Sequence, residues 1–241
     1  MKKQIPNLIT LANLLCGVLA CIYSFEETLH LAALFICLGI FFDFFDGMAA
    51  RLLNVTSPLG KELDSLADVV TSGVAPGMML YVILNQLSDI NWLCYFALLI
   101  PLFAAYRLAK FNIDIRQSHS FLGLPTPANA LIWVGLALYL SLPVYNDDYL
   151  FDSQHTILAV IIVAISICTN IMMISEIPMF SLKVNFKDLT WKTNAIQYIF
   201  LIGCVGVIAV CAFAEKIWLS LSFIIIWYII LSITTQRRHA E

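Results

Sequence analysis

Residues 30–68 read HLAALFICLGIFFDFFDGMAARLLNVTSPLGKELDSLAD, and this stretch decides how the rest of the chain is interpreted. It begins with an apolar run of membrane-spanning length and takes on acids only as that run ends. A second pair of acids opens the next apolar run. Consecutive membrane helices are antiparallel, so the end of one and the start of the next meet the same side of the bilayer. The stretch therefore predicts two membrane helices with carboxylates gathered at one membrane face.

The remaining sequence repeats this apolar pattern. Of its 241 residues, 61% are hydrophobic and 12% are charged, with a mean hydropathy of +0.89. Soluble domains usually carry about 25% charged residues, so there is too little polar surface to cover a globule of this size in water. We predict an all-α, polytopic membrane helical bundle that forms a single integral membrane domain over 1–241. The eight expected spans are 6–24, 30–52, 64–84, 92–111, 125–143, 155–174, 195–214 and 216–235.

The basic residues indicate how these spans are oriented. With both termini cytoplasmic, twelve of the thirteen Lys and Arg residues fall on the cytoplasmic side, and only Lys216 lies opposite. Cytoplasmic loops of membrane proteins carry such an excess of cations. We therefore expect a multi-pass protein of the cell (inner, cytoplasmic) membrane with both termini in the cytoplasm. The last two spans, linked by Glu215 and Lys216, are expected to form an additional C-terminal helical hairpin over 195–235.

Four aspartates form two pairs at the adjoining helix ends. Asp43 and Asp46 are three residues apart and Asp64 and Asp68 are four apart, spacings that place side chains on one helical face. Because the two helices are antiparallel, both pairs can meet at one depth. Each acid near hydrocarbon costs on the order of 3 kcal/mol, and converging acids repel one another. One or two divalent ions would relieve both costs and bind phosphate oxygens, and oxygen ligands favour Mg²⁺, Mn²⁺ or Ca²⁺.

The residues between the two pairs are suited to a phosphate ligand. Gly47 would let a ligand approach the helix backbone, and the planar guanidinium of Arg51 suits a diphosphate. Gly60 is a second permissive position, close to Ser57 and Lys61. Each has an ordinary alternative, because the cations can be positive-inside anchors and the glycines can serve packing or turns.

Two polar residues near the start of the first span have two interpretations. Asn7 and Thr10 can cap the first helix. Both also lie at the level where chemistry at the cytoplasmic face would occur.

The run Asp43-Phe-Phe-Asp46-Gly47-Met-Ala-Ala50-Arg51, then eight residues, Gly60, three residues, Asp64, three residues and Asp68, resembles the signature of the CDP-alcohol phosphatidyltransferase family. All eight fixed positions match over 43–68. The resemblance implies a membrane bundle with its active site near the cytoplasmic interface. It also implies transfer of a phosphatidyl group from CDP-diacylglycerol to an alcohol, with release of CMP, and a homodimer in the membrane lipid.

The same resemblance implies residue roles and a cofactor. Asp43, Asp46 and Asp64 would be metal ligands, and Asp68 would be both a ligand and the general base. The cofactor would be Mg²⁺ or Mn²⁺, as one ion or two, and Ca²⁺ would also fit the site. The expected contacts of the CDP-lipid are Gly47, Arg51, Ser57 and Gly60, to which we add Lys61, Asn7 and Thr10.

Three further segments, 60–76, 106–113 and 121–128, resemble the branch of the family that uses L-serine as acceptor and makes phosphatidylserine. Serine carries a carboxylate and an ammonium group, so its pocket needs a cation and an acceptor. Arg107, Lys110 and Asn112 are the acceptor-binding candidates, although Lys110 stands where that branch has Arg. Arg107 and Lys110 can equally be topology determinants.

Other functions stay open on the sequence alone. The acceptor can be glycerol 3-phosphate or an inositol phosphate, and a purely structural role would leave the aspartates unexplained. In a different class, an ion-coupled transporter would use the acids as a cation pathway, although all four cluster toward one face. No nucleic-acid partner is expected.

Overall fold

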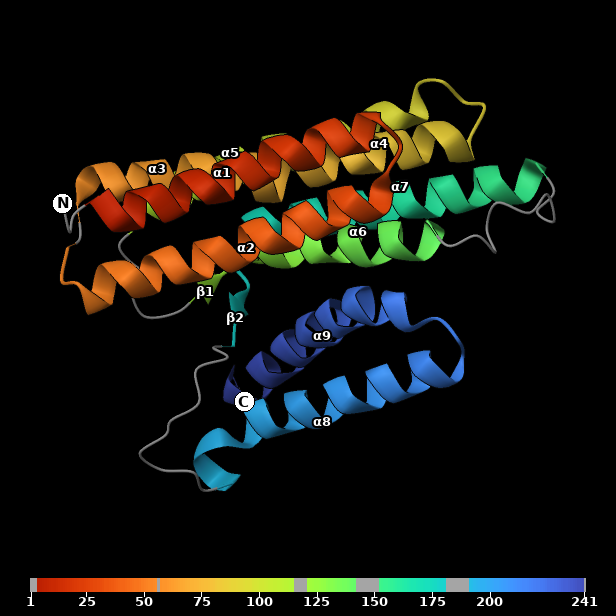
Figure 1. Ribbon diagram of the computed structural model, residues 1–241. Helices are drawn as coiled ribbons and strands as arrows, with labels where there is room; N and C mark the ends of the chain where they lie inside the picture. The colour runs from red at the N-terminus through yellow and green to blue at the C-terminus, as the bar shows by residue number, and fades with distance from the viewer. Residues whose placement is uncertain (1–3, 56, 115–120, 142–151, 181–190, 241) are drawn as a thin grey trace.

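The computed structural model describes residues 4–55, 57–114, 121–141, 152–180 and 191–240, shown in Figure 1. Its α-helices are α1 (Gln4–Phe25), α2 (Leu29–Leu52), α3 (Pro58–Asp68), α4 (Ala75–Leu87), α5 (Leu99–Ile113), α6 (Thr126–Leu140), α7 (Asp152–Ile174), α8 (Trp191–Phe213) and α9 (Ser220–Ala240). A π-helix, Val69–Val74, joins α3 to α4, and 3₁₀ segments at Leu93–Leu98 and Ile217–Leu219 precede α5 and α9. Two short strands, β1 (Phe121–Leu122) and β2 (Pro178–Met179), pair antiparallel.

The expected all-α, polytopic membrane fold is confirmed. Seven helical stretches of the described residues are long and apolar enough to cross a bilayer. The eighth, α6, has only 15 residues, which span about 22 Å at about 1.5 Å per residue, against a hydrocarbon core of about 30 Å. The predicted fifth span, 125–143, is therefore shorter as a helix, and its last two residues lie outside the described residues.

The third span begins earlier than predicted. The expected start was 64, but α3 begins at Pro58 and continues through the π-helix into α4, so the helical stretch covers Pro58–Leu87. Ser57 caps it by accepting a hydrogen bond from the Gly60 backbone N–H at 3.0 Å, and proline suits the first helical turn. Hydropathy missed this turn because it is polar. Asp64 consequently lies well inside the helix instead of at its start.

Small residues let the first four membrane spans, which are α1, α2, the stretch Pro58–Leu87 and α5, pack closely. A Cβ on Gly17 of α1 would lie 2.5 Å from Thr71 Oγ1, and one on Gly39 of α2 would also collide with the Thr71 side chain. Thr71 is fully buried in the π-helix. On the other side of this span, a Cβ on Gly77 would lie 2.8 Å from Pro101 Cδ in α5. Close backbone approach at small residues is a usual way for membrane helices to pack.

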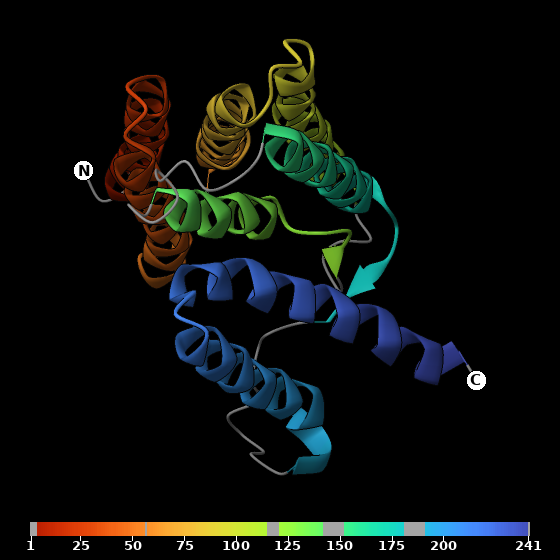
Figure 2. The same cartoon turned by 90° about the vertical axis from the view of Figure 1, so that its right-hand side faces the viewer.

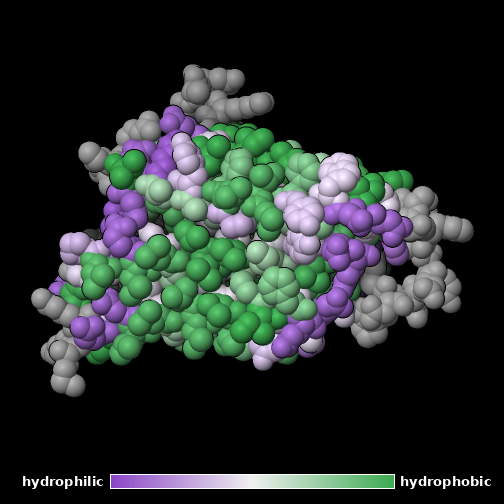
Figure 3. Space-filling view, turned by 90° about the horizontal axis from the view of Figure 1, so that it is seen from above, coloured by the Kyte–Doolittle hydropathy of each residue, from purple (hydrophilic) through white to green (hydrophobic). Residues whose placement is uncertain are grey.

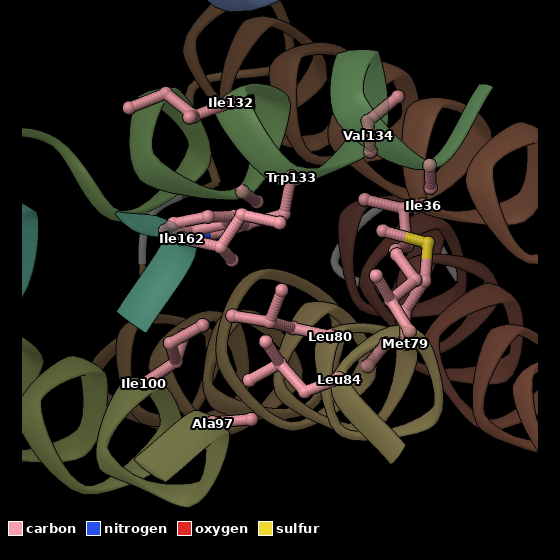
Figure 4. Packing of buried hydrophobic residues seen from close by; sticks show 14 of the residues in the cluster. Ile36, Met79, Leu80, Leu84, Ala97, Ile100, Ile132, Trp133, Val134 and Ile162 are labelled. Carbon is pink, nitrogen blue, oxygen red and sulfur yellow. The ribbon is translucent and has the colours of Figure 1, made fainter. Parts of the chain in front are cut away.

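The apolar core lies around α4 and α6, away from the acids. Figure 4 shows Met79, Leu80 and Leu84 of α4 facing Trp133 of α6, with Ile36 of α2 beside them. All five are at most 2% exposed. Since α6 packs against α2, α4, α5, α7 and α9, it is a central helix, which explains how a short helix is accommodated in the bundle.

The helices alternate in direction along one axis, so the ends of α2, α5, α7 and α9 lie together with the starts of α1, α3 and α6 (Figure 1). Figure 2 shows the α8–α9 hairpin lying to one side of the other helices, with α9 next to α6. The surface in Figure 3 has a hydrophobic middle, with hydrophilic residues gathered toward both ends. This is the distribution expected of a chain whose middle is in the bilayer.

The cation count behind the predicted orientation is only partly covered by the structure. Five of the twelve cytoplasmic cations, Lys2, Lys3, Arg116, Lys183 and Lys187, lie outside the described residues. Lys216 lies in the turn between α8 and α9, 5.7 Å from the ring of Tyr139 at the end of α6. This is the end of the bundle opposite to the acids, as the predicted topology requires. Which end faces the cytoplasm stays a prediction.

Candidate active site

Three of the four aspartates converge between α2 and α3. Asp43, Asp64 and Asp68 each offer a carboxylate oxygen, and these oxygens lie within 4.8 Å of one another. Asp68 is 9% exposed, and Asp64 Oδ1 is buried with no hydrogen-bond partner among the described residues. A buried carboxylate oxygen without a partner is costly unless a cation satisfies it. Three hard oxygen donors at this separation therefore fit a divalent ion such as Mg²⁺ or Mn²⁺.

The fourth aspartate, Asp46, lies beside the other three. It is 6% exposed, and its Oδ2 accepts a hydrogen bond from Thr10 Oγ1 of α1. The Thr10 hydroxyl is also 3.0 Å from the Pro6 carbonyl oxygen. Thr10 and Asn7 both lie inside α1, so the interpretation of these residues as helix caps is wrong. The helix already begins by Gln4, and Thr10 instead supports an acid of the site.

Asp68 is held by a residue that the sequence interpretation missed. Asn13 of α1 is fully buried, and its Nδ2 donates to Asp68 Oδ1 at 3.3 Å. The Asn13 backbone oxygen accepts from Thr71 Oγ1 at 3.0 Å, so the π-helix directly after Asp68 is anchored to the same residue. A sequence signal existed: Asn7, Thr10 and Asn13 are spaced by three and share one helical face.

A first cavity of about 250 Å³ lies between the start of α1, the end of α2 and the start of α3. Its lining includes every residue predicted to contact the CDP-lipid, together with two of the acids: Asn7, Thr10, Asp46, Gly47, Arg51, Ser57, Gly60, Lys61 and Asp64. All seven residues predicted to contact the CDP-lipid therefore line the same cavity.

Individual residues of the first cavity have distinct surroundings. A Cβ on Gly47 would meet nothing within 4 Å, so this glycine opens the α2 backbone to the cavity instead of serving helix packing. Arg51 Nε donates to the Gly47 carbonyl at 2.9 Å, which leaves its terminal nitrogens available to a ligand. Gly60 is tighter, because a Cβ there would lie 3.1 Å from Ser57 Oγ and 3.3 Å from Asn7 Oδ1.

A second, larger cavity of about 670 Å³ lies on the other side of the acids. Lys61 and Asp64 line both cavities. The second is otherwise lined by Asp43, Phe44, Ser65, Asp68, Arg107, Leu108, Phe111, Asn112, Pro125, Pro127, Phe180 and Tyr228. The acids therefore lie where the two cavities adjoin.

Two of the three acceptor-binding candidates, Arg107 and Asn112, line the second cavity, and Lys110 does not. Arg107 is 7% exposed and donates from Nη1 to Thr126 Oγ1 at 2.8 Å, while its Nε has no partner among the described residues. Asn112 donates to Ser65 Oγ at 2.9 Å, and its backbone oxygen accepts from Lys61 Nζ at 2.9 Å. Thr126, which fixes the Arg107 guanidinium, was not singled out from the sequence.

Lys110 does not join these residues. Its Nζ lies 3.4 Å from Glu176 Oε1 in an exposed ion pair, and within the described part of the chain it lies outside the linings of both cavities. Arg107 is buried, whereas the Lys110 side chain is 30% exposed and paired at the surface, so their three-residue spacing does not bring both into one cavity.

This arrangement defines a class: a polytopic membrane enzyme that gathers acids from two consecutive helices beside a cation-lined cavity. The sequence matches the family described as CDP-alcohol phosphatidyltransferase over residues 3–172. The chain belongs to the CDP-alcohol phosphatidyltransferase family. The family resemblance and the expected enzyme class are thereby confirmed, and the transporter alternative loses its support.

Several curated relatives are similar over much of their length. The chain is 45% identical over 145 residues to the CDP-diacylglycerol–serine O-phosphatidyltransferase of Bacillus subtilis, a match that covers 60% of this chain and 78% of the relative. The enzyme of the same name from Helicobacter pylori strain 26695 is 31% identical over 78% of this chain and 74% of its own. That of Methanocaldococcus jannaschii is 32% identical over 87% and 86%.

Proposed function

We propose that this chain transfers the phosphatidyl group of CDP-diacylglycerol to the hydroxyl of L-serine, giving phosphatidylserine and CMP. The observation that carries the proposal is the position of the acids at the junction of two cavities, with buried Arg107 in the second. One cavity suits an anionic nucleotide and the other a small amino acid. The serine transferases among the relatives support the choice of acceptor.

The first cavity is proposed to bind the cytidine diphosphate part of the donor. Arg51 and Lys61 supply positive charge, and the open Gly47 backbone lets the ligand come close. The nearby backbone amides at the start of α3 favour anions as well, since the N-terminus of a helix carries partial positive charge. A phosphate group bound here would face Asp46 and Asp64, which is why a cation must accompany it.

The second cavity is proposed to bind serine. The Arg107 guanidinium, held in place by Thr126, would pair with the serine carboxylate, leaving the hydroxyl free to approach Asp68. Asp68, oriented by Asn13, would accept the proton of the hydroxyl as its oxygen attacks phosphorus. Holding both substrates beside one junction lowers the barrier by removing their freedom of relative motion.

The acids are proposed to hold Mg²⁺ or Mn²⁺, as one ion or two, with Asp43, Asp64 and Asp68 as the first ligand set and Asp46 beside them. When bound, such an ion neutralises the diphosphate and stabilises the leaving CMP. Without it, four carboxylates next to a diphosphate would repel the donor.

We also propose that the whole of 1–241 forms one integral membrane domain whose active site faces the cytoplasm, in line with the positive-inside pattern. The homodimer implied by the family resemblance stays a prediction.

The test is a comparison of acceptors. Purified protein in detergent micelles would be given CDP-diacylglycerol, Mn²⁺ or Mg²⁺, and in turn serine, glycerol 3-phosphate, an inositol phosphate or no alcohol. Labelled CMP and the lipid product would both be measured. We expect serine-dependent CMP release with an equal amount of phosphatidylserine. Transfer to glycerol 3-phosphate and not to serine would overturn the choice of acceptor but keep the reaction class.

A further inference from the structure

Two residues beyond the family match reach the second cavity. The match ends at residue 172, yet Phe180, which directly follows β2, and Tyr228 of α9 line this cavity together with Asp68 and Arg107. The C-terminal part of the chain, which the family match does not cover, therefore contributes a wall to the candidate site.

This wall is built from packed aromatic rings. Tyr228 is 6% exposed, and its hydroxyl donates to the Phe180 backbone carbonyl at 3.1 Å. The ring centroids of Tyr228 and Phe180 are 4.9 Å apart, and Phe200 of α8 packs behind both, at 6.0 and 5.7 Å. The pairing of β2 with β1 holds the segment before Phe180 in place. Both helices of the hairpin thus fix the position of these two side chains.

The volume of the second cavity suggests what the aromatic wall does. At about 670 Å³ it is far larger than serine, so the acceptor alone does not fill it. Any remaining space beside the acids can hold water, and water is itself an acceptor for a phosphatidyl group. A closed site suppresses such hydrolysis by keeping water from the reacting atoms. An apolar aromatic wall in the cavity that Asp68 also lines suits this task, since its faces offer water few hydrogen-bond partners.

We infer that the Tyr228–Phe180 wall determines whether serine or water receives the phosphatidyl group. The inference rests on the proposed function. In the suppressed reaction, a water oxygen would attack the phosphorus of the phosphatidyl group and form a new P–O bond. The P–O bond to CMP would break, CMP would leave with the electron pair, and the water proton would pass to a base or to solvent. The products would be phosphatidate and CMP in place of phosphatidylserine and CMP.

The experiment measures the ratio of phosphatidate to phosphatidylserine formed by the full-length protein with CDP-diacylglycerol, Mn²⁺ and serine. This ratio does not depend on the amount of folded enzyme. For Tyr228→Ala we expect it to rise by about tenfold, the order of discrimination that one pocket contact provides. Tyr228→Phe keeps the ring and loses the hydroxyl that donates to the Phe180 carbonyl, so its ratio should rise by about threefold.

Ile230→Ala is the matched control, because Ile230 lies two residues further along α9, is 47% exposed and does not line the cavity. Its ratio should equal that of the unmodified protein. If Tyr228→Ala does not fold, Phe180→Ala opens the same wall from the other side and should give a similar rise.

The outcomes separate this inference from the proposed function. An unchanged ratio in both Tyr228→Ala and Phe180→Ala, with the unmodified protein active on serine, overturns the role of the wall alone. If the unmodified protein transfers only to another alcohol, the choice of serine fails, and the ratio of phosphatidate to that product decides on the wall. If it releases no CMP with any acceptor, both proposals fall together.

Discussion

The first three membrane spans (α1, α2 and the stretch Pro58–Leu87) and the two helices of the C-terminal hairpin are all apolar enough to cross a membrane, yet they differ in how much of their surface is buried inside the protein. The most apolar windows of the first three spans are 33%, 28% and 67% buried inside the protein, against 6% and 22% for the two helices of the hairpin. The first helices also bury a set of polar side chains: Thr10, Asn13, Asp46, Asp68 and Thr71. By contrast, α8 presents most of its apolar side chains outward, as a lipid-facing helix does.

The difference shows where chemistry can be placed in a membrane protein. Buried acids are tolerated only where neighbouring helices supply partners, and that requires close backbone approach. Gly17 and Gly39 provide it around Thr71, next to the acids. Among the described residues, the hairpin reaches the second cavity through the ring of Tyr228, which packs against Phe180 of the segment after β2. We therefore expect substitutions in the first helices to affect the reaction itself, and those in the hairpin to affect its selectivity.

The largest effect is expected for Asp68→Asn. Because asparagine cannot accept the proton of the acceptor hydroxyl, CMP release should fall by about 10²–10⁴-fold, the usual contribution of a general base. The initial rate of CMP release in micelles, at saturating serine, is the measurement.

Asp89→Asn is the matched control, because Asp89 is an exposed acid beyond α4, at the other end of the bundle. Its rate should be unchanged. A fully active Asp68→Asn protein would contradict the assignment of the base, whatever the acceptor turns out to be.

Much of this region could be predicted from the sequence. The spacing of Asp43, Asp64 and Asp68 on two antiparallel helices was enough to place their carboxylates together, because helix geometry is regular and the membrane fixes helix direction. The family resemblance and the suitability of Arg51 for a diphosphate grouped Arg51, Lys61 and their neighbours as ligand contacts, and these residues line the first cavity. Helix periodicity and the alternating direction of membrane helices can both be recognised within a short stretch of sequence, so these features could be predicted.

What the sequence did not reveal depends on contacts between distant residues. Asn13 meets Asp68 across 55 residues, and Tyr228 meets Phe180 across 48. The spacing of Asn7, Thr10 and Asn13 marks a polar face of α1, but no local pattern gives the partner of Asn13 or of Tyr228, since each contact depends on how helices rotate and slide against one another. The start of α3 was misplaced for a different reason: a polar, capped first turn has no hydropathy signal. The hairpin's contribution to the cavity was missed because apolar helices are alike in sequence.

A smaller effect is expected for Arg107→Lys. Arg107 lines the second cavity together with Asp68 of the first spans and Tyr228 of the hairpin, so this substitution tests the cavity that both regions share. Lysine keeps the charge but cannot reproduce both the hydrogen bond to Thr126 and a planar pairing with a carboxylate. We expect the KM for serine to rise by about 10-fold to 100-fold, the cost of losing a charged hydrogen bond, with little change in the KM for CDP-diacylglycerol. The two KM values, measured separately, are the readout.

An equal rise in both KM values would mean that Arg107 acts through the fold and not through the acceptor. Thr126→Val sharpens the result: it removes only the hydroxyl that positions the guanidinium, so it should raise the KM for serine by less than Arg107→Lys does.

A direct test of the packing difference compares glycines in the two regions. Gly39→Ala places a methyl group against Thr71 and 2.9 Å from Asn13 Oδ1, whereas a Cβ on Gly206 of α8 meets nothing within 4 Å. Overpacking a tight contact costs about 1–3 kcal/mol. Thermal unfolding in micelles should therefore show a lower midpoint for Gly39→Ala and an unchanged one for Gly206→Ala. Equal midpoints would show that the first helices are not packed more tightly than the hairpin.

The smallest effect is expected for Lys110→Gln, although Lys110 lies only three residues from Arg107. Its partner Glu176 belongs to the connection between α7 and β2, so this ion pair joins α5 to that connection at the surface, outside both regions. An exposed pair at 3.4 Å contributes about 0–1 kcal/mol, and Lys110 does not line the second cavity. The KM for serine should therefore change by less than about twofold, a limit set by that small energy. A rise as large as that of Arg107→Lys would mean that Lys110 leaves Glu176 and binds the acceptor, so that the site extends beyond the second cavity to the surface of α5.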